Sequence, residues 1–455
     1  MADFDPVSTA TQLAAAYTKS SQEQITAGNA DAQRTASGLT ALKSALSTFD
    51  TAMEGLSGAT SKGLRQFTAT FDASGTGTAT ATATAEAQAG TYSFYVEQIA
   101  TSHQIVFEDL PAVPVALGGP LTVQLADGSS FNVDLVAADT DSDGSISQSE
   151  IARAVNQAEG NQGKVTASVL TVNGEAQLVL SAGESGADNA ITLDTSALPA
   201  GALKDALDGG RELVAAQDAI VWLGGQGGVK LQQASNTFTA IEGVSVTFTR
   251  AMSASDTPVT LTVAADSAGT SGNVQKFVDA YNALKKSLDE LTKVGDMNAG
   301  SASAAFASDA GVRSLRSRLN RIIRQDFGGL TLMQMGIKAD RSGNLSLDAA
   351  KLDKALLADP EALDKVFGKA SIVQGEGVLG AMDQYLNLWL KSGSGQIASR
   401  KTSVEIIQKS LTKRQARLDN QYNNFYERYL MQFTQLQALQ AQMNQTMGLF
   451  ANFGT

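Results

Sequence analysis

The sequence predicts an α+β multidomain protein: helical, coiled-coil segments from both chain ends flank a helical unit, and antiparallel β domains are inserted in the middle. Three observations support this prediction. Near both ends, apolar residues recur at steps of three and four, which is typical of helices that pack along a seam. From about residue 71 to residue 266 the apolar residues alternate instead, as in half-buried strands. At 455 residues, the chain is also long for one hydrophobic core.

The N-terminal segment, residues 1–72, is expected to form a helical leg that is partly disordered. Small residues fill the seam before residue 39 and bury too little apolar surface to offset the chain entropy. Pairing of the stronger part with helices of the same molecule, or with other copies, is equally compatible with the pattern. The stronger part of the seam consists of Leu39, Leu42, Leu46, Phe49, Met53 and Leu56.

The C-terminal segment, residues 401–455, is predicted to be a second coiled-coil leg with a longer seam. Two heptad segments at opposite ends of one chain suggest that the ends come together or meet the same segments of other copies. Gln415 and Gln432 fill gaps in this seam. The candidate assembly residues are Leu411, Leu418, Tyr422, Phe425, Tyr429, Leu436, Leu439, Met443 and Phe450.

The middle of the chain is predicted to hold two β domains. Residues 73–107 and 216–266 form one, and residues 108–215 form an inserted domain that also contains a short helix after Glu150. Asp127-Gly128 and Asn173-Gly174 each separate two alternating runs, which predicts β-hairpins.

Residues 267–400 are predicted to form a helical domain with a hairpin at about residues 340–348. Its second helix, at about residues 304–325, carries five arginines in an acidic protein. A solvated face paired with acidic neighbours and a contact with an acidic surface of another subunit both fit this pattern. The arginines are Arg313, Arg316, Arg318, Arg321 and Arg324.

Charge and composition exclude several function classes. The net charge of −12 argues against a dedicated binder of nucleic acid, and no segment has the length of apolar sequence that membrane insertion needs. Cysteine is absent, and His103, the single histidine, is expected at the surface or an interface. No catalytic motif is present, so we do not expect an enzyme. The start of the chain lacks the pattern of a cleaved signal, which leaves the cytosol or an export route without one.

The stretch DTDSDGSISQSE, residues 139–150, matches the twelve-residue EF-hand calcium loop. Alternate acidic residues on a tight turn bring several oxygens together around a hard cation. A capping box at Ser147 and Glu150 explains those two residues but not the three aspartates. The incoming segment reads as a strand and no second hand is visible, so we expect a weak, structural Ca²⁺ site. Its candidate ligands are Asp139, Asp141, Asp143, Ser145, Ser147 and Glu150.

Several segments resemble the bacterial flagellar filament cap family, also called flagellar hook-associated protein 2. The most similar stretch is GIKADRSGNLSLDAAKLDKALLADPEALDKVFG, residues 336–368. FVDAYNAL at 277–284, AGTYSFYVEQIA at 89–100 and SNTFTAIEGVSVTF at 235–248 match other family segments. They occur in the family's order, whereas the interior around the acidic loop is where the resemblance is weakest.

The resemblance implies an extracellular structural protein that forms a homo-oligomeric ring at the filament tip and promotes folding and polymerisation of flagellin. Its implied partners are flagellin, the hook-filament junction protein and, before export through the flagellar type III route, a cytosolic chaperone. A calcium-stabilised surface adhesin that binds host glycan or protein is the alternative. A coiled-coil secreted protein outside the flagellum is a third hypothesis.

Overall fold

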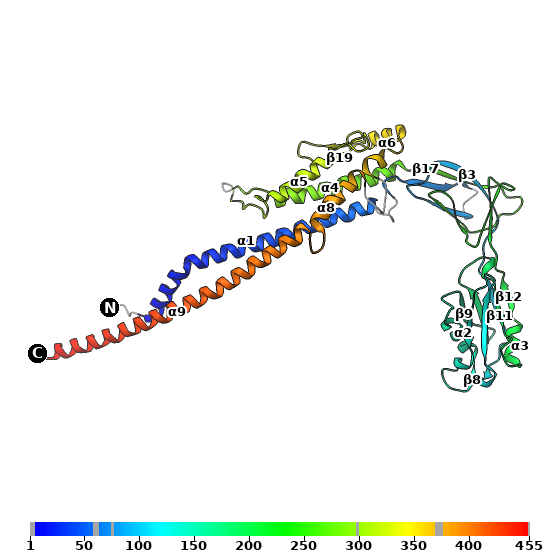
Figure 1. Cartoon of the computed structure of the whole chain (residues 1–455), viewed down its shortest axis with the longest axis horizontal. Helices are drawn as coiled ribbons and strands as arrows, with labels where there is room; N and C mark the ends of the chain where they lie inside the picture. Colours follow the sequence, from blue (N-terminus) through cyan, green and yellow to red (C-terminus); the bar gives the residue numbers. More distant parts are fainter. Residues whose placement is uncertain (1–4, 58–62, 74–76, 297–299, 369–375, 454–455) are drawn as a thin grey trace. The chain divides into compact units, whose positions relative to one another are not determined.

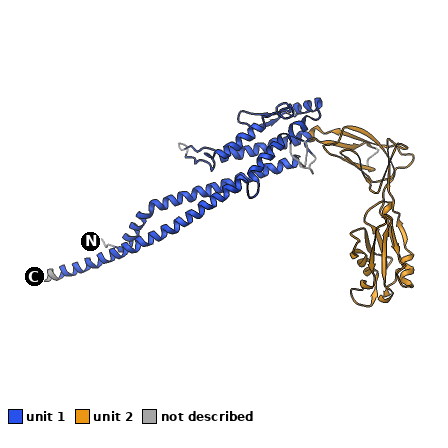
Figure 2. Cartoon of the chain, viewed as in Figure 1, with its two compact units in different colours: residues 1–64, 270–455 blue, residues 65–269 orange. Residues whose placement is uncertain are grey.

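The chain forms two compact units in its computed structural model, which describes residues 5–57, 63–73, 77–296, 300–368 and 376–453. Unit 1 contains residues 1–64 and 270–455, and unit 2 contains residues 65–269 (Figure 2). The first and last parts of the chain therefore fold together. The fold is α+β, with helices from both chain ends and antiparallel sheets between them, as predicted.

Unit 1 is mainly helical, and its two longest helices come from the two ends of the chain. These helices, α1 and α9, lie side by side (Figure 1). The unit also contains a hairpin of β18 (Ile337–Ala339) and β19 (Leu345–Leu347). Its helices are α1 (Pro6–Ser57), α4 (Ser267–Leu291), α5 (Ala310–Ile322), α6 (Ala349–Ala358), α7 (Ala362–Phe367), α8 (Gly377–Leu390) and α9 (Gln396–Phe453).

The core of unit 1 combines residues from both chain ends with the helices between them. The six strong seam residues of α1, Leu39 to Leu56, are 0–6% exposed and pack in one cluster with residues of α4, α8 and the first part of α9. Their burial favours the intramolecular alternative for this stretch. Phe277 and Phe367 meet edge to face at 5.1 Å between ring centroids. Burial also raises the pKa of Tyr281 to about 12.

Local sequence accounts for the hairpin before α6. Gly336 has a φ of +83°, and a Cβ at this position would lie 2.6 Å from the Asp348 carbonyl oxygen. Only glycine avoids both conflicts. The Asp348 side chain then caps α6 by accepting a hydrogen bond from the Lys351 N–H. The hairpin, with Gly336 before it and Asp348 after it, lies within the stretch at 336–368 that resembles the cap family.

Unit 2 begins with an all-β part built from two antiparallel sheets. The five-stranded sheet has the order β1-β17-β3-β13-β14, and the three-stranded sheet has the order β15-β16-β2. Phe94 and Phe248 lie 5.5 Å apart between ring centroids in the core of this part. Its strands are β1 (Phe67–Phe71), β2 (Ala79–Ala83), β3 (Gly90–Gln98), β13 (Ala219–Leu223), β14 (Val229–Gln233), β15 (Thr237–Ile241), β16 (Val244–Phe248) and β17 (Val259–Ala265).

The rest of unit 2 has a second core under two further sheets, ordered β12-β4-β10-β9 and β11-β6-β7, and a β5-β8 pair. The helices are α2 (Gln148–Gln157) and α3 (Ala202–Asp208), with short 3-10 turns η2 (Val115–Leu117), η3 (Val136–Ala138) and η4 (Ala187–Asn189). The strands are β4 (Gln104–Phe107), β5 (Val113–Pro114), β6 (Pro120–Leu125), β7 (Ser130–Asp134), β8 (Ser145–Ile146), β9 (Val165–Val172), β10 (Glu175–Ala182), β11 (Ile191–Asp194) and β12 (Arg211–Val214).

Both predicted hairpins are confirmed. β6 and β7 pair around Gly128, which has a φ of +89°, and β9 and β10 pair around Asn173 and Gly174. Asn173 and Gly174 have φ values of +54° and +91°, the conformation of a type I′ turn. The predicted short helix is α2. It begins at Gln148, so Glu150 lies in its first turn and not before it.

Several predicted boundaries move. The N-terminal leg does not reach residue 72, because α1 ends at Ser57 and β1 pairs along its whole length with β17. β4 joins the sheet of the inserted part through pairs with β10 and β12, so the predicted boundary at 107/108 falls too late. α9 begins at Gln396 instead of 401, and the basic helix is shorter than predicted, 310–322 instead of 304–325. The start of the chain is helical from Pro6, where partial disorder was expected.

Candidate functional sites in the paired end helices and the acidic loop

The N-terminal part of α1 packs against α9 through small residues. Ala10 and Ala14 are 0% exposed, while Leu411 and Leu418 of α9 are 7% and 6% exposed. Small side chains let two helices approach closely, so the weak part of the predicted seam becomes a contact surface once α9 is present. The predicted seam residues Leu411 and Leu418 thus lie inside unit 1.

A reciprocal amide pair links the two helices. Gln22 Nε2 donates to Gln415 Oε1 at 3.1 Å, and Gln415 Nε2 donates to Gln22 Oε1 at 2.9 Å. A polar pair at one seam position favours one register of two helices, because a shift would break both hydrogen bonds between the amides. Gln415, which interrupts the apolar seam, therefore aligns α9 with α1.

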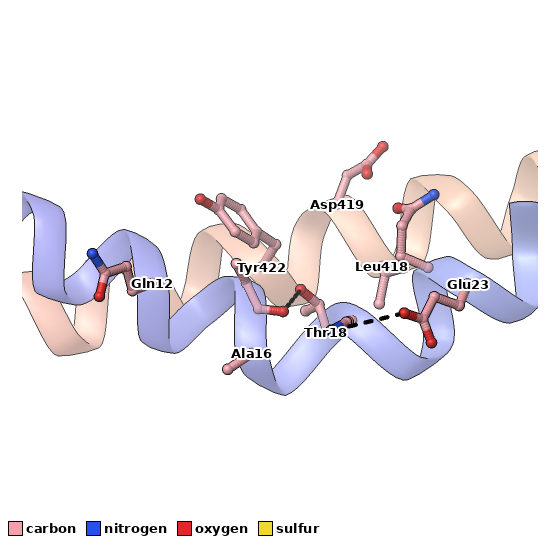
Figure 3. A pocket seen from close by; sticks show the side chains of 10 residues that line it. Gln12, Ala16, Thr18, Glu23, Leu418, Asp419 and Tyr422 are labelled. Carbon is pink, nitrogen blue, oxygen red and sulfur yellow. Dashed lines mark hydrogen bonds and ion pairs between the residues drawn. The ribbon is translucent and has the colours of Figure 1, made fainter.

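Next to this pair lies an open groove of about 590 Å³ between α1 and α9. Figure 3 shows Thr18 and Ala16 of α1 below Leu418 and Tyr422 of α9. Thr18 donates its hydroxyl hydrogen to the carbonyl oxygen of Ala14, so it is satisfied within its own helix. The groove is lined by small and apolar side chains together with the charged Lys19, Glu23 and Asp419.

Aromatic residues close the contact between the start of α1 and α9. Tyr17 stacks on Tyr429 with ring centroids 5.8 Å apart and lies 5.5 Å from the ring centroid of Phe425. Arg428 lies over the rings of both Phe425 and Tyr429. The hydrogen bond between the two hydroxyls raises the pKa of Tyr17 and lowers that of Tyr429.

Beyond the aromatic contact, the predicted seam residues of α9 are open to solvent. Leu436, Leu439 and Met443 are 41%, 54% and 57% exposed, and Met447 continues the stripe at 66%. We call these four residues the open stripe. Phe450 lies outside the residues whose side chains the structure describes. The residues of one heptad pattern are thus buried in the earlier part of α9 and exposed in its last part.

The acidic loop brings the three aspartates together. Carboxylate oxygens of Asp139, Asp141 and Asp143 lie within 4.8 Å of one another. Asp139 accepts hydrogen bonds from the N–H groups of Ser142 at 2.7 Å and Gly144 at 3.0 Å. Gly144 has a φ of +83° and permits the reversal. After the turn, Ile146 is 0% exposed and pairs with Val113 of β5, so a strand occupies the place where a second hand would lie.

Ser147 and Glu150, the two remaining candidates that would bind calcium through their side chains, form the capping box of α2. Glu150 Oε2 accepts hydrogen bonds from the Ser147 N–H at 2.8 Å and the Ser147 hydroxyl at 2.9 Å, and Oε1 accepts one from the Thr140 N–H at 3.1 Å. These hydrogen bonds lower the pKa of Glu150. The Ser145 N–H donates to Asp143 at 2.7 Å. The three aspartate side chains therefore lie close together, whereas the carboxylate oxygens of Glu150 already accept hydrogen bonds from protein groups.

His103 is buried within the chain, at 6% exposed, so the expectation that it lies at the surface or an interface is wrong. Its Nδ1 accepts a hydrogen bond from the Ile191 N–H at 2.8 Å, and its Nε2 lies 3.0 Å from Glu212 Oε1. These contacts require the neutral ring with its hydrogen on Nε2. The ring, one residue before β4, thereby contacts β11 and β12, which is a structural role.

Two family models cover both ends of the chain. The model described as flagellar hook-associated protein 2 N-terminus matches residues 2–103, and the model described as flagellar hook-associated protein 2 C-terminus matches residues 216–445. The chain belongs to the flagellar hook-associated protein 2 family. All four segments quoted for the resemblance lie inside the matched ranges. The acidic loop lies outside both.

Individual family members are similar over most of the chain. The lateral flagellar hook-associated protein 2 of Vibrio parahaemolyticus is 36% identical over 80% of this chain and 81% of its own length. The B-type flagellar hook-associated protein 2 of Pseudomonas aeruginosa is 30% identical over 89% and 86%. The crystal structure of D1-D2-D3 domains of the Escherichia coli flagellar cap protein FliD has a TM-score of 0.62 and 26% identity, and covers 81% of this chain and 99% of that one.

The solved relative from Escherichia coli is a flagellar cap protein, and none of these relatives supports the adhesin alternative. Within the described residues, no helix combines the length and apolar character needed to cross a bilayer. Sequence reasoning missed the Gln22–Gln415 pair, although the glutamine at a seam position was its visible signal. It also missed the aromatic contact of Tyr17, because a tyrosine in a weak seam does not reveal its partner.

Proposed function

We propose that this chain caps a growing flagellar filament as a ring of copies and promotes the folding and addition of flagellin. The observation that carries the proposal is the match at both chain ends to one family, together with the extensive similarity to a solved flagellar cap protein. The mechanism needs no covalent chemistry. It depends on surfaces that bind subunits and release them again.

The two units support separate parts of this function. Unit 1 supplies a long helix pair whose outer end carries the open stripe, a surface suited to apolar segments of filament subunits. The partners proposed for this end are flagellin and the hook-filament junction protein. Unit 2 supplies antiparallel sheets that would cover the filament end. Export without a cleaved signal, assisted by a cytosolic chaperone, and an extracellular position at the tip complete the proposal.

A deletion strain tests the proposed function. Removal of the coding sequence is expected to leave cells with short or absent filaments and with flagellin in the medium, and the full-length chain supplied in trans should restore both. The measurements are filament length by electron microscopy and flagellin in the culture supernatant. Normal filaments with no released flagellin would contradict the proposal.

We also propose that the acidic loop binds one structural calcium ion. The convergence of Asp139, Asp141 and Asp143 fits a hard cation, and the Ser145 carbonyl is the next ligand of the motif. Glu150 and Ser147 would join only by leaving the capping box. A single loop of this kind is expected to bind with a Kd of about 10⁻⁴ to 10⁻³ M. The ion would stiffen the strand-to-helix connection before α2.

Calcium titration by calorimetry and thermal unfolding tests the loop. About 10 mM Ca²⁺ should stabilise unit 2 by roughly 1–3 kcal/mol. Asp141→Asn and Asp143→Asn keep the backbone hydrogen-bond acceptors but lose charge, so they should abolish the shift without lowering the calcium-free melting temperature. Glu150→Gln is the control for capping, because it should lower the calcium-free melting temperature. No calcium-dependent shift in the wild-type chain would refute the site.

A further inference from the structure

The side of α5 that faces away from the core of unit 1 carries a row of arginines. Leu315 and Leu319 on the opposite side are 0% and 2% exposed. Arg318, Arg321 and Arg324 follow one another at three-residue steps and are exposed, so they lie along one side of the helix and its end. We call these three residues the arginine face. Residues 310–325 include no aspartate or glutamate.

The arginine face is not neutralised within its own unit. The neighbouring Arg316 pairs with Asp289 at 2.9 Å, and Arg313 donates to the Ser308 carbonyl oxygen. Across the described ranges of the chain, no ion pair or hydrogen bond involves the side chains of the arginine face. Favourable interaction with the helix dipole explains basic residues in the last turn of α5 but not a row that begins at Arg318.

Unit 2 contains a groove with the complementary charge. It has a volume of about 500 Å³ and lies between the end of β4 and α3. Glu108 pairs with Arg211, but Asp109 and Asp205 are exposed and make no side-chain ion pair among the residues described. Arginine binds such a site through two contacts, because its methylene stem packs on apolar atoms while its guanidinium meets carboxylates. The groove is lined by Val106, Glu108, Asp109, Pro111, Asp205 and Arg211.

The two units also differ strongly in net charge. Unit 2 has seven Lys and Arg against 23 Asp and Glu, a formal charge of −16, whereas unit 1 has 27 against 23, a formal charge of +4. The acidic character of the whole chain is therefore that of unit 2. The basic arginine face of unit 1 is therefore complementary in charge to the acidic unit 2.

We propose that the arginine face of one copy binds the acidic groove of a second copy. The two surfaces are different patches of one chain, so the contact is heterologous and repeats from copy to copy, as a closed ring requires. This inference rests on the ring in the proposed function and specifies one of its contacts. Exposed charges carry the contact, so added salt should weaken it.

Complementary charge reversal tests the contact by sedimentation velocity of purified full-length chains at low ionic strength. Arg318→Glu with Arg321→Glu, and separately Asp109→Arg with Asp205→Arg, should each weaken self-association about tenfold or more. An equimolar mixture of the two variants should recover it, because every contact then joins opposite charges. Lys354→Glu with Lys391→Glu makes the same change in charge on other exposed surfaces of unit 1 and should leave association unchanged.

Recovery in the mixture requires contacts between different copies, so it separates the proposal from a contact inside one chain. Wild-type association by either reversed variant, or failure of the mixture although both variants show native circular dichroism, would overturn the proposal. So would a wild-type chain that does not self-associate. Impaired capping in cells with association intact would assign the face to another filament protein and would also overturn it. The deletion strain tests the cap function independently of each of these results.

Discussion

Leu46→Ala is expected to lower the free energy of unfolding of unit 1 by about 2–5 kcal/mol. Leu46 is 0% exposed and packs in the cluster that joins α1 to α4, α8 and α9. Truncation removes buried methyl groups and leaves a cavity between helices that are held on several sides, so the site relaxes little. A loss of this size is a large part of the stability of a typical domain.

Leu439→Ala is the matched control, because it makes the same chemical change at a heptad position that is 54% exposed. It should change the free energy of unfolding by less than about 0.5 kcal/mol. Denaturant unfolding followed by Trp389 fluorescence reports unit 1, provided that Trp222 of unit 2 is replaced by phenylalanine in every variant. Equal effects of the two leucine substitutions would contradict the assignment of residues 39–56 to the core.

Leu46 and Leu439 differ in burial although both lie at apolar positions of a heptad pattern. The pattern predicts a helix and its apolar side at both positions, and both predictions agree with the structure. It contains no information on which helix covers that side. Leu46 is buried in a cluster with residues of helices that lie far away in sequence, whereas Leu439 is exposed, and only the folded chain distinguishes them.

Short-range sequence signals predict the hairpins of unit 2 correctly, but they misplace the boundary between its two β domains. Asn173-Gly174 determines its hairpin because a type I′ turn needs positive φ at both residues, and this requirement is local. β4 instead pairs with β10 and β12, which lie about seventy to one hundred residues later in the sequence, so no local pattern indicates which sheet it joins.

The acidic loop illustrates a motif whose residues have two uses. Ser147 and Glu150 satisfy both the calcium template and the capping box, and in the sequence the three aspartates are what favours the calcium interpretation. The structure gives Glu150 three protein donors, so its presence is explained without an ion. The three aspartates also accept hydrogen bonds from backbone N–H groups of the loop, but their convergence is the feature on which the calcium hypothesis rests. For that reason the decisive substitutions lie at Asp141 and Asp143.

Triple replacement of Leu436, Leu439 and Met443 by serine is expected to abolish capping in cells without destabilising unit 1. These side chains are 41–57% exposed, so their removal opens no cavity. In the proposed function they form the apolar contact with filament subunits, and serine removes most of the apolar area that such a contact would bury. Expressed in the deletion strain, the variant should give short or absent filaments and flagellin in the medium.

The control must separate loss of the open stripe from loss of helix. Ala438→Ser, Ala441→Ser and Gln445→Ser lie on the opposite, exposed side of α9 and also replace good helix formers by serine. This second variant should retain full-length filaments, and both variants should unfold at the wild-type denaturant concentration. If the stripe variant still built normal filaments, the end of α9 would not be the capping contact. Equal loss with both variants would show that helix content, not the apolar stripe, is what the filament end requires.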